Sequence, residues 1–269
     1  MTPDPTVCVK SPQEKVKIVR DFKRPHARNF IDGLFDDFFE IHGDRCFGED
    51  RALLCGIAHF EGVPVTVAGH VKGANLEQNL ASNFGMPNPE GYRKFARVVK
   101  QAQKFHRPVI TFVDTPGAYP GKGAEERGQG EAIAQCLYIL SGLETPVITI
   151  VTGEGGSGGA LALSVADRIY MLEHAIYSIL SPEGFASILW KDARRANEAC
   201  DVMKLTAQDL KGFDMIDGII PEPEEGITAN PQAAFDGIRA VIRSSLEELN
   251  ALDTQTLLEH RYQRFRKFN

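Results

Sequence analysis

The sequence predicts an α/β protein built on a largely parallel sheet. Between residues 89 and 172, β-rich runs alternate with helical runs, and the order strand, loop, helix, strand is typical of βαβ units. Two glycine-rich segments follow predicted strands, which is where α/β sheets bind their ligands. The chain has 269 residues, of which 43% are hydrophobic, so it is long enough to bury a sizeable core.

The N-terminal part of the chain divides into two segments. Residues 1–26 are polar and contain prolines, so we expect a tail or docking arm with room for one helix, followed by a domain over residues 27–269 that includes a C-terminal helical extension. From Ala27 to Glu40, apolar residues such as Phe30 and Leu34 recur at helical spacing. We therefore expect one amphipathic helix over this range.

The remaining elements follow from the same kinds of pattern. Two β-rich runs, 53–60 and 63–68, are separated by Glu61-Gly62, which predicts a β-hairpin. From Pro231 onward the chain looks helical and charged. Between these regions we expect a helix over 89–106, a strand over 109–114, a helix over 127–143, a strand over 147–151, a short helix after residue 159 and a strand over 168–172.

Composition excludes several kinds of partner and site. The net charge of −6 argues against nucleic acid, because neutralising phosphates requires a basic surface. The five cysteines are scattered and form no C-x-x-C pair, which argues against a zinc site and against a disulfide framework. No apolar run approaches the ~18 residues of a membrane span, and no signal peptide is visible, so we expect a cytoplasmic protein without a membrane partner.

The first glycine-rich loop runs from Asp114 to Gly121 and continues to Gly128. Its two prolines restrict the backbone, while Gly117 and Gly121 allow conformations closed to other residues. We expect a stiff, exposed turn whose amides point into a cleft, with Asp114 tying down those amides. A plain connection from strand to helix is the alternative.

The second loop, Gly153-Glu-Gly-Gly-Ser-Gly-Gly159, precedes a short apolar helix. So many glycines cost chain entropy, which makes sense where the backbone itself must approach a ligand. The N-terminus of a helix presents free N–H groups, so this is a natural site for an anion. A P-loop is excluded because no Gly-Lys-[Ser/Thr] follows, and the dinucleotide-binding pattern does not fit either.

Hydrolysis is a more serious alternative. Gly155-Gly-Ser-Gly-Gly159 matches the G-x-S-x-G nucleophile elbow, which would make Ser157 a nucleophile. That reaction needs a histidine base, and neither His174 nor His260 lies on a loop suited to the role. A backbone oxyanion hole is the preferred interpretation, because preorganised N–H donors stabilise developing negative charge without a side-chain nucleophile.

Three further groups of residues are interpreted as structural. Ser181-Pro182-Glu183 is typical of a helix start, with serine as N-cap and proline at the first helical position. Glu125 and Glu126 are assigned to a helix start, where the dipole favours acidic residues. Trp190, the single tryptophan, is expected to pack in the core or at an interface.

With these residues in hand, the sequence resembles the α subunits of the multisubunit acetyl-CoA carboxylase carboxyltransferase. The resemblance covers most of residues 30–265 in order, and several long motifs in the right order are far more specific than one glycine pattern. The matching stretches are Asn83-Phe-Gly-Met-Pro, Pro89-Glu-Gly-Tyr-Arg-Lys94, Phe112-Val-Asp-Thr-Pro-Gly-Ala-Tyr-Pro-Gly121, Gly123-Ala-Glu-Glu-Arg-Gly-Gln129, Gly153-Glu-Gly-Gly-Ser-Gly-Gly-Ala-Leu-Ala162, Ser181-Pro-Glu-Gly184, Ala186-Ser-Ile-Leu-Trp-Lys191 and Ile219-Ile-Pro-Glu-Pro223.

The resemblance implies a crotonase-like spiral of ββα units with N- and C-terminal helices. It implies transfer of CO2 from carboxybiotin to acetyl-CoA, giving malonyl-CoA for fatty acid synthesis. Loss of CO2 would leave a ureido enolate that takes a proton from the acetyl methyl group, and the resulting carbanion would attack CO2. In this chain Gly158 and Gly159 would form the oxyanion hole that polarises the biotin ureido carbonyl. Residues lining the biotin or substrate cleft would be Gly117, Ala118, Tyr119, Pro120, Gly121, Gly155 and Gly156.

The resemblance also implies partners. Carboxybiotin would arrive on biotin carboxyl carrier protein, which biotin carboxylase loads. A carboxyltransferase β subunit would complete an α2β2 core, bringing a zinc ribbon and the oxyanion hole for the thioester enolate, so no metal is expected in this chain.

This sequence departs from the family pattern in two places. Ala74 follows Lys72-Gly73 where the family usually has arginine, and the N-terminal helical region is shorter. A paralogue acting on another acyl-CoA therefore stays open. So does a self-contained crotonase-like hydratase or isomerase, although that needs a pair of glutamates and the run after Gly159 is Ala-Leu-Ala-Leu. A scaffold that has lost the chemistry is the third alternative.

Overall fold

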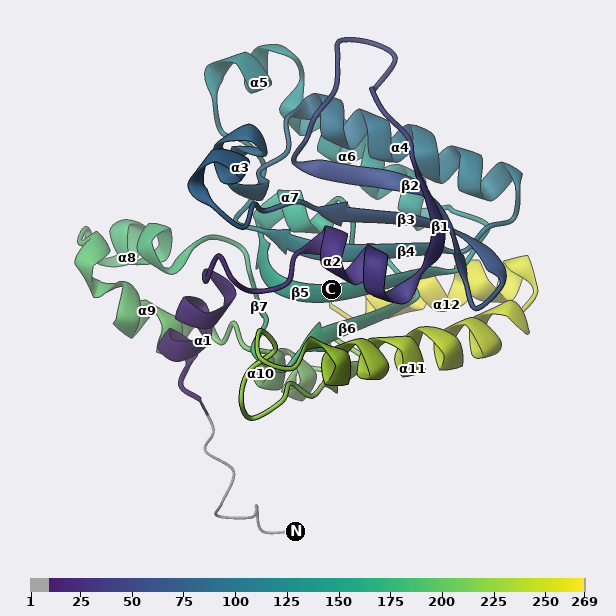
Figure 1. The fold of residues 1–269 in the computed structure, drawn as a ribbon. Coiled ribbons are helices and arrows are strands. Elements are labelled where there is room, and N and C mark those ends of the chain that lie inside the picture. Colours follow the sequence, from purple (N-terminus) through teal and green to yellow (C-terminus); the bar gives the residue numbers. More distant parts are fainter. Residues whose placement is uncertain (1–9, 269) are drawn as a thin grey trace.

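A central sheet with helices packed around it organises the chain (Figure 1). The structure is a computed structural model that describes residues 10–268. The strands are β1 Asp36–Glu40, β2 Leu53–Phe60, β3 Val63–His70, β4 Val109–Thr115, β5 Val147–Gly156, β6 Arg168–Leu172, β7 Ile176–Ser178 and β8 Gly218–Ile220. The helices are α1 Pro12–Val19, α2 Ala27–Leu34, α3 Leu76–Ala81, α4 Pro89–Lys104, α5 Lys122–Glu126, α6 Gln129–Ser141, α7 Ser157–Leu161, α8 Pro182–Trp190, α9 Ala196–Met203, α10 Ala207–Gly212, α11 Pro231–Asn250 and α12 Thr254–Arg266, with short 3-10 turns at Asn83–Gly85 and Ala193–Arg195.

The sheet is parallel through its centre, as predicted. Its strand order is β1-β2-β3-β4-β5-β6-β8, with β7 paired to the end of β5. The hairpin of β2 and β3 is antiparallel, and all pairings from β3 onward are parallel. The hairpin turn is confirmed at Glu61-Gly62, where both residues have positive φ (50° and 83°), as a two-residue turn between twisted strands requires. The crotonase-like fold expected for the chain is the one observed.

The helix expected over residues 27–40 is wrong in its second half. It ends at Leu34, and residues 36–40 form β1, an edge strand that pairs antiparallel with β2. Phe30, Ile31 and Leu34 are fully or almost fully buried, and the ring of Phe30 stacks on that of Phe112 at 5.7 Å. The helical spacing therefore predicts residues 27–34, which pack on the core, but not residues 36–40. There, hydrogen bonding to β2 outweighs the local helix propensity.

The second glycine loop is a strand followed directly by a helix. We expected β5 to end near residue 151, but it continues to Gly156, and α7 begins at the next residue. The extension exists because Glu154, Gly155 and Gly156 pair with β7, a three-residue strand whose pairing with β5 no sequence pattern predicted. Gly155 and Gly156 therefore lie in a paired strand, whereas Gly158 and Gly159 lie in α7.

The described part of the N-terminal segment, residues 10–26, contains one helix, α1. Helix α1 packs against α9, β5 and β7, and Arg24 beyond it is only 2% exposed. At the other end of the chain, α11 packs against α2, β5 and β8, and α12 packs against α6. The buried Arg261 of α12 binds Asp167 at 2.6 Å. Across residues 10–268, no helix combines the length and the apolar character that a membrane crossing demands.

Candidate active site

The two glycine-rich segments meet at the carboxyl ends of β4 and β5. Thr115 of β4 pairs with Gly155 of β5, so the chain leaves both strands side by side. A Cβ atom on Gly156 would lie 2.1 Å from the Pro116 carbonyl oxygen. A Cβ on Gly159 would lie 2.6 Å from the amide nitrogen of Ala118. The two backbones are therefore in direct contact, and only glycine permits that approach.

Most of the other glycines of β5 are explained in the same way. A Cβ on Gly155 would meet the Tyr177 ring at 2.2 Å, and one on Gly153 would meet Oδ1 of Asp114 at the same distance. Gly158 of α7 differs from them, because the first side-chain atom that its Cβ would meet is Cγ2 of Ile133 at 3.6 Å, an ordinary contact. Packing therefore explains the glycines behind the site, but it does not explain Gly158.

A sharp turn aims the amides of the second segment. Ser157 has a positive φ of 54°, an uncommon conformation for a residue with a side chain, and α7 begins there. The first N–H groups of a helix have no intrahelical acceptor. Among residues 10–268, the amides of Gly158 and Gly159 donate no hydrogen bond to a backbone carbonyl outside the regular helices and strands. These amides are available to an oxygen bound at the N-terminus of α7.

A cavity of about 490 Å³ adjoins these amides. Its walls come from both glycine segments, from α6 and from the chain that leaves β7. Of the residues named from the sequence, Gly121, Gly155 and Gly156 do not line it, which corrects that part of the prediction. Those that do line it are Gly117, Ala118, Tyr119, Pro120, Gly158 and Gly159.

Hydrogen bonds hold the first loop in shape. Thr115 Oγ1 accepts the amide of Gly117 at 3.0 Å, and Gly117 takes a φ of 147°. The amide of Tyr119 donates to the Pro87 carbonyl at 3.0 Å, and the side chain of Gln129 donates to both Pro87 and Tyr119. These bonds restrain the turn, as expected. The expectation that its amides point into the cleft is wrong for Gly117 and Tyr119, because both amides donate to protein oxygens.

The carboxylates near this loop are distributed differently from the prediction. Glu125 and Glu126 belong to a separate helix, α5, and do not begin α6. Glu125 lies in the first turn of α5 and also lines the cavity, whereas Glu126 pairs with Lys122 at 3.3 Å.

A second, apolar cavity of about 460 Å³ adjoins the first and shares Ser157 and Gly158 with it. Sequence reasoning missed it, because its walls come from short elements between residues 161 and 215 that have no clear periodicity. Several of its apolar side chains face solvent, among them Ile179, which is 77% exposed, and Phe213, which is 57% exposed. Exposed apolar side chains clustered beside a cavity are typical of a surface that another protein covers. The lining residues include Leu161, Tyr177, Phe185, Met203, Leu210 and Met215.

Ser181 and Trp190, both given structural roles from the sequence, lie at the start and at the end of α8. Ser181 caps α8, because its hydroxyl accepts the amide of Gly184 at 3.1 Å and Pro182 follows it, as predicted. Trp190 is half-buried at the surface, where it packs against Phe185 and lies under the guanidinium of Arg195 at 4.1 Å.

The hydrolase alternative lacks a base. Ser157 is exposed and its hydroxyl makes no hydrogen bond within the described residues. His174 lies in another cavity with Arg24 and Glu222, and burial lowers the pKa of its ring. His260 is exposed on α12. Neither histidine contacts Ser157, so the geometry of a catalytic triad is absent from residues 10–268.

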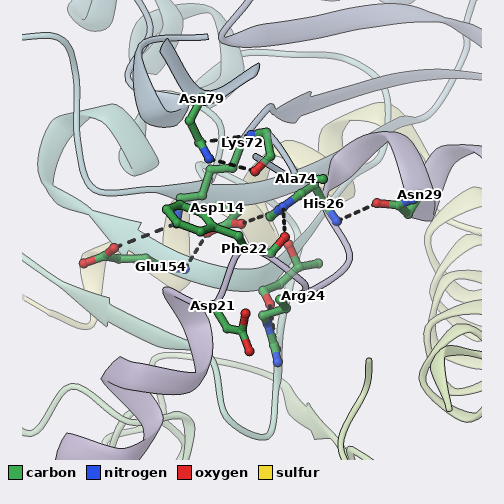
Figure 2. Close-up of polar contacts among 12 residues, drawn as sticks. Asp21, Phe22, Arg24, His26, Asn29, Lys72, Ala74, Asn79, Asp114 and Glu154 are labelled. Carbon is green, nitrogen blue, oxygen red and sulfur yellow. Dashed lines mark hydrogen bonds and ion pairs between the residues drawn. The ribbon is translucent and has the colours of Figure 1, made fainter. Parts of the chain in front are cut away.

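Behind the site lies a network of buried charges (Figure 2). Asp114 accepts Lys72 Nζ at 2.6 Å and the amide of Glu154 at 2.9 Å. Burial by itself would raise the pKa of Asp114, but the Lys72 ammonium and these hydrogen bonds hold it well below its ordinary value. The prediction that Asp114 ties down the first loop is corrected, since its carboxylate binds β5. Ala74 lies in the same region, where its amide donates to Gln78.

No group of three or more histidine, cysteine or carboxylate side chains that could hold a metal ion occurs among residues 10–268. Cys55, Cys136 and Cys200 are buried and Cys46 is exposed, all with free thiols, and Cys8 lies outside the described residues. The arrangement is therefore one of backbone amides facing a cavity, with ionised side chains behind them.

Comparison with solved structures shows the fold. The transcarboxylase 12S crystal structure with methylmalonyl-coenzyme A and methylmalonic acid bound superposes with a TM-score of 0.70 at 21% identity, over 92% of this chain and 46% of that one. A Pseudomonas malonate decarboxylase hetero-tetramer in complex with coenzyme A superposes with a TM-score of 0.67 at 17% identity, over 82% of this chain and 91% of that one.

Comparison with known sequences shows the family. An "acetyl-coenzyme A carboxylase carboxyl transferase subunit alpha" from Clostridium botulinum is 58% identical over 97% of this chain and 96% of its own length. One from Clostridium perfringens is 60% identical over 94% of this chain and 93% of its own length. A Natranaerobius thermophilus protein named for "subunits beta/alpha" is 55% identical over 95% of this chain, which matches 42% of that protein. Residues 8–269 match the family described as "Acetyl co-enzyme A carboxylase carboxyltransferase-like", and the chain belongs to this family.

Proposed function

We propose that this chain is the α half of an acetyl-CoA carboxylase carboxyltransferase. With a β subunit it transfers CO2 from carboxybiotin to acetyl-CoA and so forms malonyl-CoA. The observation that carries the proposal is the pair of amides at Gly158 and Gly159, which lack backbone acceptors among the described residues and face a cavity. The identity to α subunits over nearly the whole chain supports the same assignment.

The role of this chain's residues follows from that geometry. The biotin group supplies CO2 in activated form. As it does so, negative charge develops on the ureido oxygen, and two N–H donors fixed before the reaction stabilise that charge by a few kcal/mol each. The stiff first loop, with Gly117 to Pro120, lines the same cavity. The side chain of Ser157 has no part in this chemistry.

A second subunit completes the site in this proposal. The amides account for one oxyanion hole, whereas the acyl-CoA enolate needs another, and the exposed apolar residues beside the site, such as Ile179 and Phe213, offer a surface to cover. The relative that is named for both β and α subunits supports a β partner. The partner would bring the zinc ribbon, and biotin carboxyl carrier protein, loaded by biotin carboxylase, would bring carboxybiotin. An α2β2 assembly in the cytoplasm is the form expected from the family.

Reconstitution tests the proposal. The chain is expressed alone and together with a β subunit, and carboxyl transfer from malonyl-CoA to biocytin, the reverse reaction, is measured. Turnover by the mixture and none by the chain alone is the expected result. Turnover by the chain alone would contradict the shared site, and an active mixture that prefers another acyl-CoA would identify a paralogue.

A further inference from the structure

A bulge in β5 lies immediately before the glycine segment that carries the proposed amides. Val113 pairs with Val151 and Thr115 pairs with Gly155, so one residue of β4 faces three residues of β5, Thr152–Glu154. A bulge bends its strand and redirects the chain beyond it. The position of this bulge therefore determines where the backbone of Gly155 to Gly159 runs.

Charged side chains hold each end of the bulge. The carbonyl oxygen of Thr152 accepts two hydrogen bonds from the guanidinium of Arg24, at 3.0 and 2.8 Å. The amide of Glu154 donates to the buried carboxylate of Asp114 at 2.9 Å. The Glu154 carboxylate, in turn, accepts Arg20 Nη2 at 2.8 Å. Bonds between charged and backbone groups of this kind are stronger than neutral ones.

Two of these side chains, Arg20 and Arg24, come from the segment between α1 and α2, which is far from β5 in the sequence. Figure 2 draws Arg24, Asp114 and Glu154 among the side chains around this part of β5. Arg24 is 2% exposed and pairs with Glu222 at 2.7 Å. Arg20 binds Glu183 of α8 as well as Glu154. This segment therefore joins three separate parts of the fold at one point behind the site.

Neither arginine lines the cavity beside Gly158 and Gly159. Arg20 lines a neighbouring cavity that shares Pro116 with it, and Arg24 lines another. The bulge is what connects both arginines to the segment that carries the amides. Catalytic groups have to be held within about 0.5 Å of their productive positions by a supporting shell, and a misplacement of about 1 Å can cost ~10²-fold in rate.

We infer that Arg20 and Arg24 are positioning residues of the active site, which act by fixing the β5 bulge and thereby the amides of Gly158 and Gly159. The inference rests on the proposed function. It gives the N-terminal segment a role inside this chain, in addition to any role in docking.

Arg20 is the better residue for a test, because the pairing of Arg24 with Glu222 is fully buried and its loss would threaten folding. The Arg20 side chain is 35% exposed. In the complex with the β subunit, Arg20→Gln should lower kcat for carboxyl transfer to biocytin by about 10- to 100-fold. The KM for malonyl-CoA and the thermal midpoint should not change, and Arg20→Lys should restore part of the rate.

Two further variants sharpen the test. Glu154→Gln weakens the same contact from the other side, and the double variant should lose no more activity than either single variant, because the two residues act as one unit. Arg243→Gln is the control: Arg243 pairs with Glu61 in a more exposed ion pair on other elements, and its loss should leave activity unchanged.

A wild-type kcat in both Arg20→Gln and Glu154→Gln would overturn the inference, as would a raised KM for malonyl-CoA at unchanged kcat. Hydrogen exchange separates this result from a failure of the proposed function. If the wild-type complex has no carboxyl-transfer activity, the function fails, but the amides of residues 155–161 should still exchange faster in Arg20→Gln than in the wild type. Unchanged exchange would refute the positioning role on its own.

Discussion

A methyl group added at Gly159 provides a direct test of the contact between the two glycine segments. Its Cβ would lie 2.6 Å from the amide nitrogen of Ala118 and 2.7 Å from the carbonyl carbon of Gly117. Non-bonded heavy atoms are comfortable at about 3.5 Å, so the segments must separate by about 0.9 Å. A displacement of about 1 Å at a catalytic group costs on the order of 10²-fold in rate, or about 2.7 kcal/mol of transition-state stabilisation.

Gly159→Ala should therefore fold, at a cost of about 1–3 kcal/mol from overpacking, but lose about 10²-fold in kcat. The assay is carboxyl transfer to biocytin in the complex with the β subunit, with a thermal melt of the same sample. Gly142→Ala is the matched control, because its Cβ would meet no atom within 4 Å. A folded Gly159→Ala variant with wild-type kcat would refute the reasoning that the contact positions the amides.

Three other predictions concern residues with different roles. Gly158→Val should fold like the wild type, because its Cβ meets only Ile133 at 3.6 Å, but should abolish turnover by filling the mouth of the cavity; normal turnover would contradict this. Ser157→Ala should retain activity within about twofold, whereas a large loss would revive the hydrolase alternative. Burial lowers the pKa of His70 to about 4, below the 6.5 of an unfolded histidine. Between these two values the unfolded chain binds a proton that the folded chain does not, so the stability of the fold decreases as the pH falls from about 6.5 to about 4. Between pH 7 and pH 5 the free energy of unfolding should fall by about 2 kcal/mol. Urea unfolding should detect this fall in the wild type and a much smaller one in His70→Gln; an equal pH dependence in both proteins would contradict the prediction.

The fold class and the order of the central elements could be predicted from the sequence because they depend on local patterns. Residues 109–114 and 147–151 are apolar β-rich runs, and both lie in central strands that are buried throughout. Elements that depend on pairing with distant residues could not be predicted. Strand β7 has three residues, and the extension of β5 to Gly156 exists only because β7 lies beside it.

The glycine segments of the candidate site could be recognised in the sequence, but the contacts that support them could not. Glycines at the ends of two predicted strands indicated where backbone would approach a ligand, and the two segments do meet there. The pairing of Asp114 with the amide of Glu154, and the contact of Arg24 with Thr152, join residues that are 40 and 128 positions apart. No spacing rule within one segment reports such contacts, because they exist only once the sheet has formed.

The central claim is that the amides of Gly158 and Gly159 together bind the ureido oxygen of biotin in a site shared with a second subunit. A crystal structure of the complex with a β subunit and bound biotin tests it most directly. We expect the ureido oxygen within about 3.2 Å of both amide nitrogens, with the partner's residues closing the cavity. A ureido oxygen bound elsewhere, or a cavity closed by this chain alone, would contradict the account.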